Sequence, residues 1–340
     1  MSTLREAFDA VLKGRSLDAA EAETVFGEIL DDVVPDALVA GFLVALRLKG
    51  ETAAELAGGV RAMRHRARPL NLDDGRVLDT AGTGGDGAGT FNISTGAALV
   101  AAAAGVATAK HGNRAISGRV GAADVLERFG VRLELDPAGL RRCLARARIC
   151  FVFAPAWHPV LARLAVLRRT LGIRTIFNLM APLANPARPR YQLLGVAEPR
   201  LLQPIAEALV ALEVEHALVV HGLDGLDEIS LSAPTSVIEM RRGTLDSYRI
   251  APENFAIEGA SAAQFLTADA GDAMEILRHA LGGEPGPARD VLALNAGAAI
   301  YAGQGAASLA EGVRIAQEVL ASGRALVTIE QLRVASQEAS

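Results

Sequence analysis

A glycine-rich segment with several hydroxyl side chains is the first part of the chain whose residue types could bind a ligand. Residues 81–95 read Ala-Gly-Thr-Gly-Gly-Asp-Gly-Ala-Gly-Thr-Phe-Asn-Ile-Ser-Thr, between a short apolar run and an alanine-rich one. Glycines let a backbone approach a ligand closely, and the free N–H groups at a helix N-terminus suit phosphate. The spacing of Gly82, Gly84 and Gly87 also fits a dinucleotide motif, which would need an acidic residue after the next strand. A tight turn without a ligand is the alternative.

The next predicted strand ends in cations instead of that acid. Its end and the residues after it read Lys110, His111, Gly112, Asn113 and Arg114. No Gly-Lys-Ser/Thr sequence follows the glycines, which excludes a P-loop. Because the carboxyl ends of parallel strands share one edge of a sheet, the two loops together predict a pocket for a phosphorylated ligand. The alternative is that Lys110 and Arg114 form an ordinary solvated surface pair.

A third loop carries three carboxylates after another predicted strand. Asp224, Asp227 and Glu228 lie in the glycine-containing segment 222–230. Mg²⁺ prefers one or two carboxylates together with the phosphates of a substrate. Placed opposite the phosphate site, this loop predicts a bridging Mg²⁺; taken alone, it is equally consistent with a solvated acidic turn.

Two adjacent arginines, Arg168 and Arg169, lie on a predicted helix, so at most one of them faces a cleft. A guanidinium there would bind a carboxylate through two hydrogen bonds, and the alternative is a solvated surface. Other polar features favour structural roles: we expect His158 to be packed and hydrogen-bonded, and the basic run 61–68 to be a solvated helix end. The spacing gives no Ser-His-Asp or Cys-His pair and no metal-binding His or Cys motif.

The elements that must position these loops are a helical segment followed by alternating strands and helices. Apolar residues recur at helical spacing through the first seventy residues, without a strand pattern. Strands are predicted at 76–80, 106–110, 150–153, 175–177, 193–196 and 217–221, and a hairpin at 237–250. Helices are predicted at 94–104, 122–129, 137–147, 159–171, 199–212, 273–281, 288–301 and 307–321. The fold class is therefore α/β: a small helical domain, 1–70, and a larger domain, 71–340, with a mostly parallel central sheet flanked by helices.

Composition narrows the class of protein further. A chain of 340 residues with 51% hydrophobic and 21% charged residues is not disordered, and its formal net charge of −5 argues against a nucleic-acid partner. The most apolar run, 96–109, is too short to span a membrane. Two cysteines, Cys143 and Cys150, are too few for a disulfide scaffold, and we expect buried thiols. With no signal-peptide pattern at the N-terminus, a cytoplasmic location is expected.

Several segments, in order along the chain, resemble the anthranilate phosphoribosyltransferase family. They are Gly82–Asp86, Asn92–Thr95, Lys110–Arg114, Arg174–Asn178, Pro182–Pro186 and Gly225–Glu228. The resemblance covers nearly the whole chain and implies a nucleoside phosphorylase/phosphoribosyltransferase-like fold. It also implies a homodimer that forms through the helical domain, with part of the 160–185 region packed on that domain. The implied activity is transfer of the phosphoribosyl group of phosphoribosyl pyrophosphate (PRPP) to anthranilate in tryptophan biosynthesis.

Matching positions carry the implied site residues. The resemblance implies PRPP binding by Gly82, Gly85, Asp86, Thr90, Asn92, Ser94, Thr95, Lys110, His111, Gly112, Asn113, Arg114 and Ser117. It implies Mg²⁺ as the cofactor, bound by Ser94, Asp227 and Glu228, and anthranilate binding by Gly82, Asn113 and Arg168. No distinct catalytic residue is expected, because the aromatic amine already carries a free lone pair and positioning and charge stabilisation suffice.

The sequence also departs from the family pattern. Gly118 and Ala122 stand where relatives carry hydroxyls that contact PRPP, while Met180-Ala181-Pro182 and Ala184 replace Leu-Gly-Pro and Thr. Each hydrogen bond to a charged phosphate contributes about 1.5–3 kcal/mol, so losing two would weaken PRPP binding unless Arg119 compensates.

Two alternative functions remain open at this point. One is a paralogue with the same fold that binds nucleic acid, which the missing hydroxyls and the basic run 61–68 favour and the net charge opposes. The other is a related transferase or nucleoside phosphorylase that acts on a different acceptor.

Overall fold

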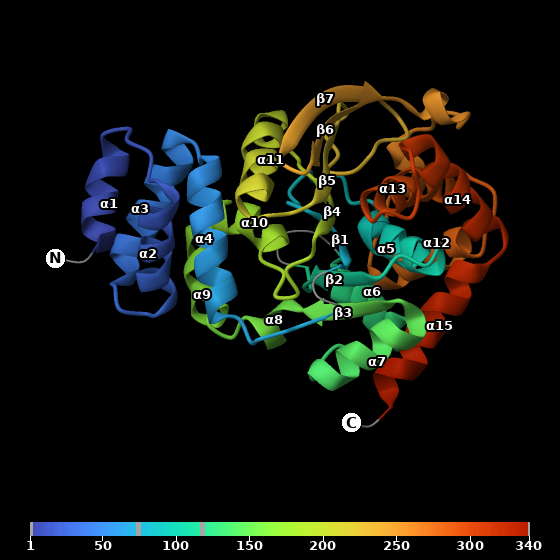
Figure 1. Ribbon diagram of the computed structural model, residues 1–340, viewed down its shortest axis with the longest axis horizontal. Coiled ribbons are helices and arrows are strands. Elements are labelled where there is room, and N and C mark those ends of the chain that lie inside the picture. The colour runs from blue at the N-terminus through green and yellow to red at the C-terminus, as the bar shows by residue number, and fades with distance from the viewer. Residues whose placement is uncertain (1–2, 73–75, 116–119, 339–340) are drawn as a thin grey trace.

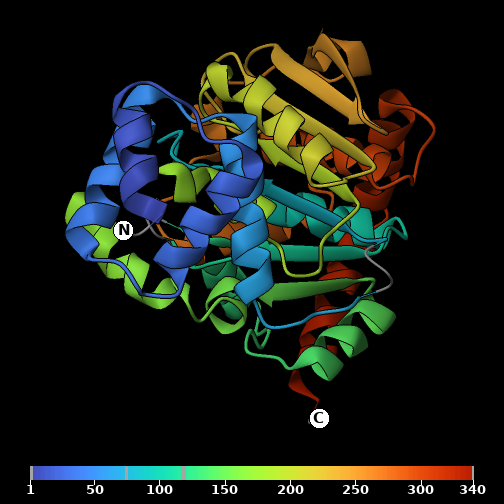
Figure 2. The same ribbon diagram turned by 60° about the vertical axis from the view of Figure 1, so that its left-hand side comes forward.

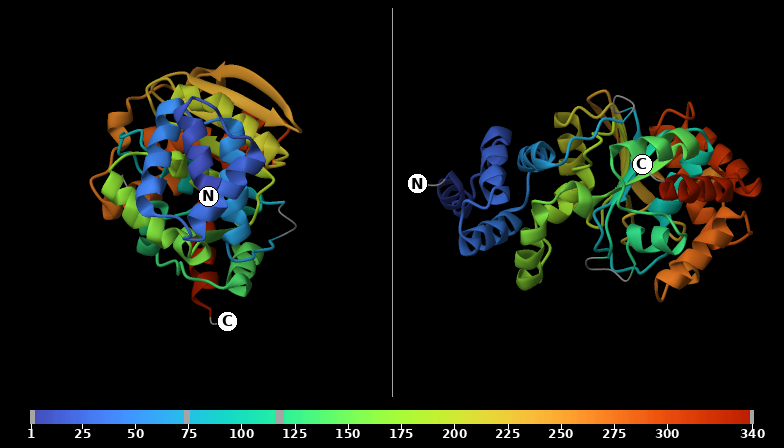
Figure 3. Two further views of the ribbon diagram at one scale, coloured as in Figure 1. Left: turned by 90° about the vertical axis from the view of Figure 1, so that its left-hand side faces the viewer. Right: turned by 90° about the horizontal axis from the view of Figure 1, so that it is seen from below.

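The computed structural model describes residues 3–72, 76–115 and 120–338, and it begins with a helical bundle. The bundle lies at one end of the molecule, with the C-terminal helices at the other (Figures 1 and 3). Its helices are α1 Thr3–Leu12, α2 Ala19–Leu30, α3 Asp36–Lys49 and α4 Ala53–Arg66. Asp18 and Thr52 form capping boxes with Glu21 and Glu55, which satisfies the first N–H groups of α2 and α4.

The larger part is built on a central sheet. The described residues form a seven-stranded sheet in the order β3-β2-β1-β4-β5-β6-β7, in which β1 to β5 are parallel and β6 and β7 are antiparallel. The strands are β1 Leu78–Gly82, β2 Thr108–Gly112, β3 Ile149–Phe153, β4 Tyr191–Gly195, β5 His216–Gly222, β6 Thr235–Arg241 and β7 Thr244–Ile250. The order places β1 between β2 and β4, so the loops after β1, β2 and β5 converge on one edge.

Helices cover both faces of this sheet. One face packs against α5 Ile93–Ala103, α6 Ala122–Arg128, α7 Pro137–Ala147, α12 Ala270–Leu281, α13 Pro287–Ala302, α14 Leu309–Ala321 and α15 Arg324–Gln337 (Figure 1). The other packs against α11 Leu202–Ala211. Helices α11 and α10 Ile176–Met180 in turn pack against α4 of the bundle, which stands in front of the sheet in Figure 2. The short α8 Ala154–Trp157 and α9 Leu161–Leu171 connect β3 to α10.

Strand β5 illustrates why the sheet reads as continuous apolar runs. Leu218 and Val220 belong to the hydrophobic core on the α5 and α13 side, and Ala217 and Val219 belong to the core shared with α11 and the bundle. Alternate side chains of a strand point to opposite faces, so a sheet that is buried on both sides needs apolar residues at every position.

The predicted fold class is confirmed, and most predicted elements lie within a few residues of the observed ones. The hairpin turns at Arg242 and Gly243, both with positive φ (49° and 83°), which suits a tight two-residue turn. The predicted strand at 175–177 is wrong, because this segment begins helix α10. There the backbone N–H of Thr175 donates to Asn178 Oδ1 over 3.1 Å, a local cap that outweighs the β preference of Thr, Ile and Phe.

Two further predictions concern the cysteines, which we expect to be buried thiols, and the most apolar run, which is too short to span a membrane. Cys143 and Cys150 are both buried free thiols. Among the described residues, no helix is both long and apolar enough to cross a membrane.

Candidate active site

The carboxylate loop after β5 lies across the ends of β1 and β4. Gly82 and Gly195 are register partners at these ends. A Cβ on Gly82 would lie 2.3 Å from Asp227 Oδ2, and a Cβ on Gly195 would lie 1.5 Å from the carbonyl oxygen of Asp227. Glycine is therefore required at position 195 for the loop to reach the strand ends, and a Cβ at position 82 would displace the Asp227 carboxylate.

Hydrogen bonds join this loop to the glycine-rich loop that follows β1. The N–H of Gly84 donates to Asp227 Oδ2 over 2.6 Å, and the N–H of Ser94, in the first turn of α5, donates to Glu228 Oε1 over 3.1 Å. Both carboxylates thus face the backbone N–H groups that the sequence assigns to phosphate binding. The two loops predicted to hold metal and phosphate lie against each other.

The carboxylates of Asp227 and Glu228 are buried, so a nearby positive charge would stabilise them. Burial raises the pKa of both Asp227 and Glu228, and repulsion from Asp86 raises it further. A divalent cation beside them would stabilise their ionised forms. Among the described residues, no group of three or more His, Cys, Asp or Glu side chains could hold a metal. The donor set therefore fits Mg²⁺ that takes its remaining ligands from substrate phosphates and water, and not a metal enclosed by protein.

Lys110, at the end of β2, is buried on the same edge. Its Nζ donates to the carbonyl oxygen of Thr80 over 2.5 Å and to Ser94 Oγ over 3.2 Å. Burial lowers the pKa of Lys110, and the nearby carboxylates of Asp79 and Glu228 oppose that shift. An ammonium has three donors, and the described contacts use two of them. A phosphate oxygen could take the third.

Asp79 orients the residue that follows Lys110. Its Oδ1 accepts from the N–H of His111 over 3.1 Å, and its Oδ2 accepts from Asn185 Nδ2 over 2.9 Å. Burial raises the pKa of Asp79 to about 6, against the effect of Lys110. Asn185 also donates to the carbonyl of Ala109, so this buried network fixes the end of β2.

Arg168 approaches the site from α9. Its guanidinium carbon lies 5.9 Å from the centre of the Phe177 ring, and burial lowers its pKa. Arg169, its neighbour, is exposed. The helix therefore directs Arg168 toward the cavity and Arg169 toward solvent.

A cavity of about 590 Å³ unites most of the predicted residues. Its lining includes Gly82, Gly85, Asp86, Thr90, Asn92, Ser94, Lys110, His111, Gly112, Asn113, Arg114, Arg168, Asp227 and Glu228. Thr95 is buried and is not part of this lining, and Ser117 lies outside the described residues, as do Gly118 and Arg119. Arg114 lies at the cavity with its guanidinium paired to Glu127. Ala122, at the start of α6, also lines the cavity.

Other lining residues were not identified from the sequence as site residues. His158 lies beside His111, with ring centres 5.3 Å apart, and burial lowers the pKa of His158 to about 4. Met63 reaches the cavity from α4, and Asn178 from α10. His158 and Met63 carry no local signal for binding, and only the packing of helices on the sheet edge brings them here. Asn178 belongs to the motif 174–178, which was a signal for it.

Arg174 is a further residue that sequence reasoning did not assign a role. Its Nη1 donates to the carbonyl of Gly84, and its Nη2 donates to the carbonyl of Thr83 over 2.9 Å. Its own carbonyl accepts from Arg47 Nη1 over 2.9 Å, so the contact chain runs from the bundle to the glycine-rich loop. The motif 174–178 was the sequence signal that could have identified Arg174.

Comparison with protein families divides the chain in the same order. Residues 5–67 match the helical bundle domain of a glycosyl transferase family, and residues 74–326 match the a/b domain of a glycosyl transferase family.

Individual relatives are similar over almost their full length. Anthranilate phosphoribosyltransferase from Thermomicrobium roseum is 49% identical over 330 residues, covering 96% of this chain and 95% of that protein. The crystal structure of the enzyme of that name from Thermus thermophilus superposes with a TM-score of 0.93 at 42% identity, covering 99% of this chain and 100% of the other. The Saccharomyces cerevisiae protein in complex with PRPP and Mg superposes with a TM-score of 0.88 at 26% identity, covering 98% of each.

Proposed function

Since the chain belongs to the anthranilate phosphoribosyltransferase family, we propose that it transfers the phosphoribosyl group of PRPP to the amine of anthranilate, in tryptophan biosynthesis. The products are N-(5-phosphoribosyl)anthranilate and pyrophosphate. The observation that carries this function is the convergence of the glycine-rich loop, Lys110 and the Asp227–Glu228 pair on one cavity. Relatives at 49% identity carry the same name over nearly the whole chain.

The glycine-rich loop and the end of β2 form the proposed PRPP site. Gly82, Gly85, Asp86, Thr90, Asn92, Ser94, Lys110, His111, Gly112, Asn113 and Arg114 line the cavity and are assigned to this substrate. Thr95, behind the lining, and Ser117, outside the described residues, complete the assignment. The glycines of this loop allow its backbone to approach phosphate oxygens closely, because they carry no side chain.

Asp227, Glu228 and Ser94 are the proposed Mg²⁺ ligands. The two carboxylates are paired with backbone N–H groups and share a site where burial disfavours their charge, which a cation would offset. When bound, Mg²⁺ would neutralise charge on the departing pyrophosphate. A solved relative holds Mg together with PRPP, which supports this assignment.

Anthranilate is assigned to Gly82, Asn113 and Arg168. The planar guanidinium of Arg168 can bind a carboxylate through two hydrogen bonds, and its partial burial strengthens that interaction. A Saccharomyces cerevisiae relative was solved in complex with 4-fluoroanthranilate, at 25% identity and a TM-score of 0.86.

Positioning and charge stabilisation account for the chemistry. The C1–O bond to pyrophosphate breaks, positive charge develops at C1 of the ribose, and the amine nitrogen forms the new C1–N bond before losing a proton to water. Lys110 stabilises the departing negative charge, and Arg168 aims the amine at C1. The amine lone pair is free at neutral pH, so the reaction needs no strong general base.

We also propose that the chain forms a homodimer through the helical domain, 1–70, with part of region 160–185. Several large apolar side chains of these segments are exposed: Leu12 in α1 (63%), Leu48 in α3 (83%) and Val166 in α9 (57%). Apolar exposure of this kind is typical of a surface that packs against another protein. Sedimentation equilibrium should give twice the chain mass for the wild type and a monomer for Leu48→Glu.

The decisive experiment follows the loss of anthranilate fluorescence with purified protein, PRPP and Mg²⁺. Turnover is expected in the wild type and is expected to disappear in the Asp227→Ala/Glu228→Ala double variant. Absence of turnover at millimolar PRPP, with another aromatic amine or base consumed instead, would refute the proposed acceptor.

A further inference from the structure

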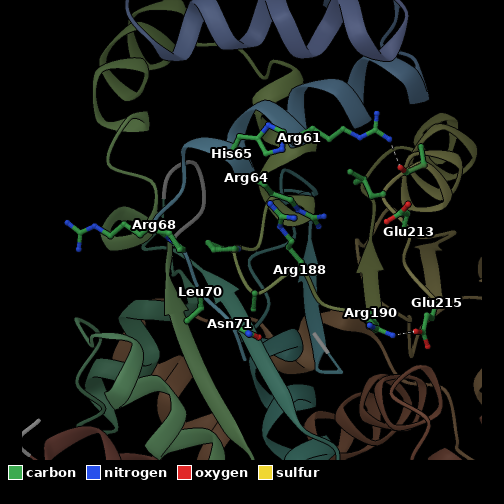
Figure 4. Close-up of a pocket in the computed structure, with 15 residues that line it drawn as sticks. Arg61, Arg64, His65, Arg68, Leu70, Asn71, Arg188, Arg190, Glu213 and Glu215 are labelled. Carbon is green, nitrogen blue, oxygen red and sulfur yellow. Dashed lines mark hydrogen bonds and ion pairs between the residues drawn. The ribbon is translucent and has the colours of Figure 1, made fainter. Parts of the chain in front are cut away.

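A hollow rich in arginine lies away from the cavity described above (Figure 4). It is bounded by the C-terminal half of α4, by the segments that precede β4 and β5, and by the end of α11. The segments that precede β4 and β5 lie at the amino ends of these strands, whereas the proposed active site lies at the carboxyl ends. The hollow is therefore at the opposite edge of the sheet. Its volume is about 1150 Å³, which can contain a small molecule.

Three arginines around the hollow lack a carboxylate partner. Arg61 Nη2 donates to the carbonyl of Ala211 and Arg64 Nη2 donates to the carbonyl of Leu183, each over 2.7 Å. Arg188 precedes β4 and is exposed. Among residues 3–72, 76–115 and 120–338, none of these three arginines forms an ion pair.

The other charged residues nearby do not neutralise these three. Arg190 Nη1 is paired with Glu215 Oε1 at 2.5 Å, and His65 Nδ1 lies 3.0 Å from Glu23 Oε1. Arg68 also borders the hollow, and Figure 4 shows its guanidinium group directed away from Arg64 and Arg188. The basic run 61–68 is therefore not uniformly a solvated helix end, since Arg61 and Arg64 are half-buried and turned inward.

Arg64 and Arg188 bring two positive charges near each other, which is electrostatically unfavourable. They lie near each other at the centre of Figure 4 although they come from different parts of the fold, the bundle and the α/β domain. Burial lowers the pKa of Arg64 to about 10; repulsion from Arg188 and Arg61 adds to this shift, and the carboxylate of Asp79 opposes it. Its Nε is buried without a hydrogen-bond partner among the described atoms. An anion between the two guanidinium groups would satisfy these donors and relieve the repulsion.

We propose that this hollow is a second binding site, for a small phosphate monoester whose phosphate lies between Arg64 and Arg188, with Arg61 at the rim. Guanidinium groups match the oxygens of phosphate, and three of them suit a doubly charged anion better than a single carboxylate. Glu213 and Glu215 line the other side, which disfavours a long polyanion such as nucleic acid and favours hydroxyl or amino groups on the ligand.

A ligand in this hollow would be coupled to the cavity at the opposite sheet edge. Arg64 holds the carbonyl of Leu183 in the 3-10 turn η2 Ala181–Leu183, and two residues of that turn, Ala181 and Pro182, line the cavity. Met63, the neighbour of Arg64, also reaches the cavity. The ligand would tie the bundle to the α/β domain, so its binding should alter the KM for substrates. The binding itself does not depend on the proposed function.

Isothermal titration of the full chain with ribose 5-phosphate tests the proposal. Two classes of site are expected in the wild type: one lost in Lys110→Ala and the other weakened at least tenfold in Arg188→Gln. Arg68→Gln is the matched control, because it removes an equal charge from an arginine that faces away; its affinity should change less than twofold. Arg188 is exposed and outside the catalytic cavity, so the folded state and kcat of Arg188→Gln should match the wild type.

Further arms of the titration identify the ligand and can overturn the site. Inorganic phosphate should compete for the same class of site, and tighter binding of ribose 5-phosphate would assign the ester group a role in recognition. If Arg68→Gln and Arg188→Gln weaken the binding of ribose 5-phosphate equally, the effect is due to net charge alone and the proposed site is refuted. Retention of both classes in Arg188→Gln, or displacement of ribose 5-phosphate by duplex DNA at lower concentration than by phosphate, would refute it as well.

Discussion

The N–H of Gly84 donates to Asp227 Oδ2 over 2.6 Å, so a direct hydrogen bond joins the glycine-rich loop to the carboxylate loop. The contact directs one carboxylate oxygen of Asp227 into the glycine-rich loop. Because the hydrogen bond favours the ionised carboxylate, it also offsets part of the cost of its burial. The two halves of the proposed Mg²⁺ and PRPP site are therefore oriented in advance.

Gly195→Ala should disrupt this arrangement from outside the ligand contacts. The added Cβ would lie 1.5 Å from the carbonyl oxygen of Asp227, a backbone atom that can move only with its loop. Displacement of about 1 Å at a reacting centre costs on the order of 100-fold in rate. We expect kcat/KM to fall by about that factor. The rate of anthranilate consumption, measured at a series of Mg²⁺ concentrations, checks this. Gly259→Ala, where the nearest atom lies 3.3 Å away, is the control, and equal activity of the two variants would contradict this steric account.

Arg174→Lys should weaken PRPP binding while leaving the fold intact. Lysine keeps the charge but cannot donate to the carbonyls of Thr83 and Gly84 with a planar fork. Loss of one hydrogen bond from a charged donor costs about 1.5 kcal/mol, which is roughly a tenfold rise in the KM for PRPP. Initial rates at varied PRPP measure this, with Arg169→Lys as the exposed control. An unchanged KM together with a lower kcat would instead place Arg174 in the chemical step.

Arg168→Ala should separate the two substrates. Removal of the guanidinium deletes the proposed partner of the anthranilate carboxylate, so the KM for anthranilate should rise about 10- to 100-fold, equivalent to about 1.5–3 kcal/mol. The KM for PRPP should change by less than twofold, and Arg169→Ala should resemble the wild type. No effect on anthranilate would indicate a different acceptor, because then nothing in α9 would recognise this carboxylate.

Glu239→Gln should lose stability in a pH-dependent manner far from the site. Burial alone would raise the pKa of Glu239, but hydrogen bonds from His216, Tyr301 and Tyr248 outweigh it and lower the pKa to about 2. A folded pKa below the unfolded value stabilises the fold above pH 4.5, and this contribution is lost as the pH falls toward 2.

Urea unfolding at several pH values measures that contribution. The free energy of unfolding of Glu239→Gln should lie about 1–2 kcal/mol below the wild type at pH 7, with the gap closing toward pH 3. Glu253→Gln, at an exposed position, is the control. A gap that stays constant down to pH 3 would show that packing and not ionisation causes the loss.

The loops after β1, β2 and β5 could be predicted from the sequence because each signal is local: a short apolar run, then glycines or charges, then a helix. The place of His158 could not be predicted, because it arises only when segments distant in the chain pack together. Arg174 lies in the motif 174–178, but its contact with the glycine-rich loop arises in the same way. The error at 175–177 has a different origin. Propensity favours a strand there, and one side-chain cap, Asn178 on Thr175, decides for a helix.

The inward turn of Arg61 and Arg64 illustrates the same limit. A basic run at a helix end is usually solvated, and the sequence contains no sign that the segment before β4 would bring Arg188 opposite it. By contrast, helix geometry alone predicts that Arg168 and Arg169 point in different directions. The sequence does not say which of the two faces the cavity.

The hydrophobic interior of the bundle is continuous with that of the α/β domain. Phe26 of α2 packs edge-on against Phe177 of α10, with ring centres 5.7 Å apart, and the same apolar cluster continues to Val219 in the sheet. Excision of the first seventy residues would therefore strip one wall from the remainder of the protein. We therefore expect the two sequence modules to unfold as a single cooperative unit, and amide hydrogen exchange in α2 and in β5 should report one common opening event.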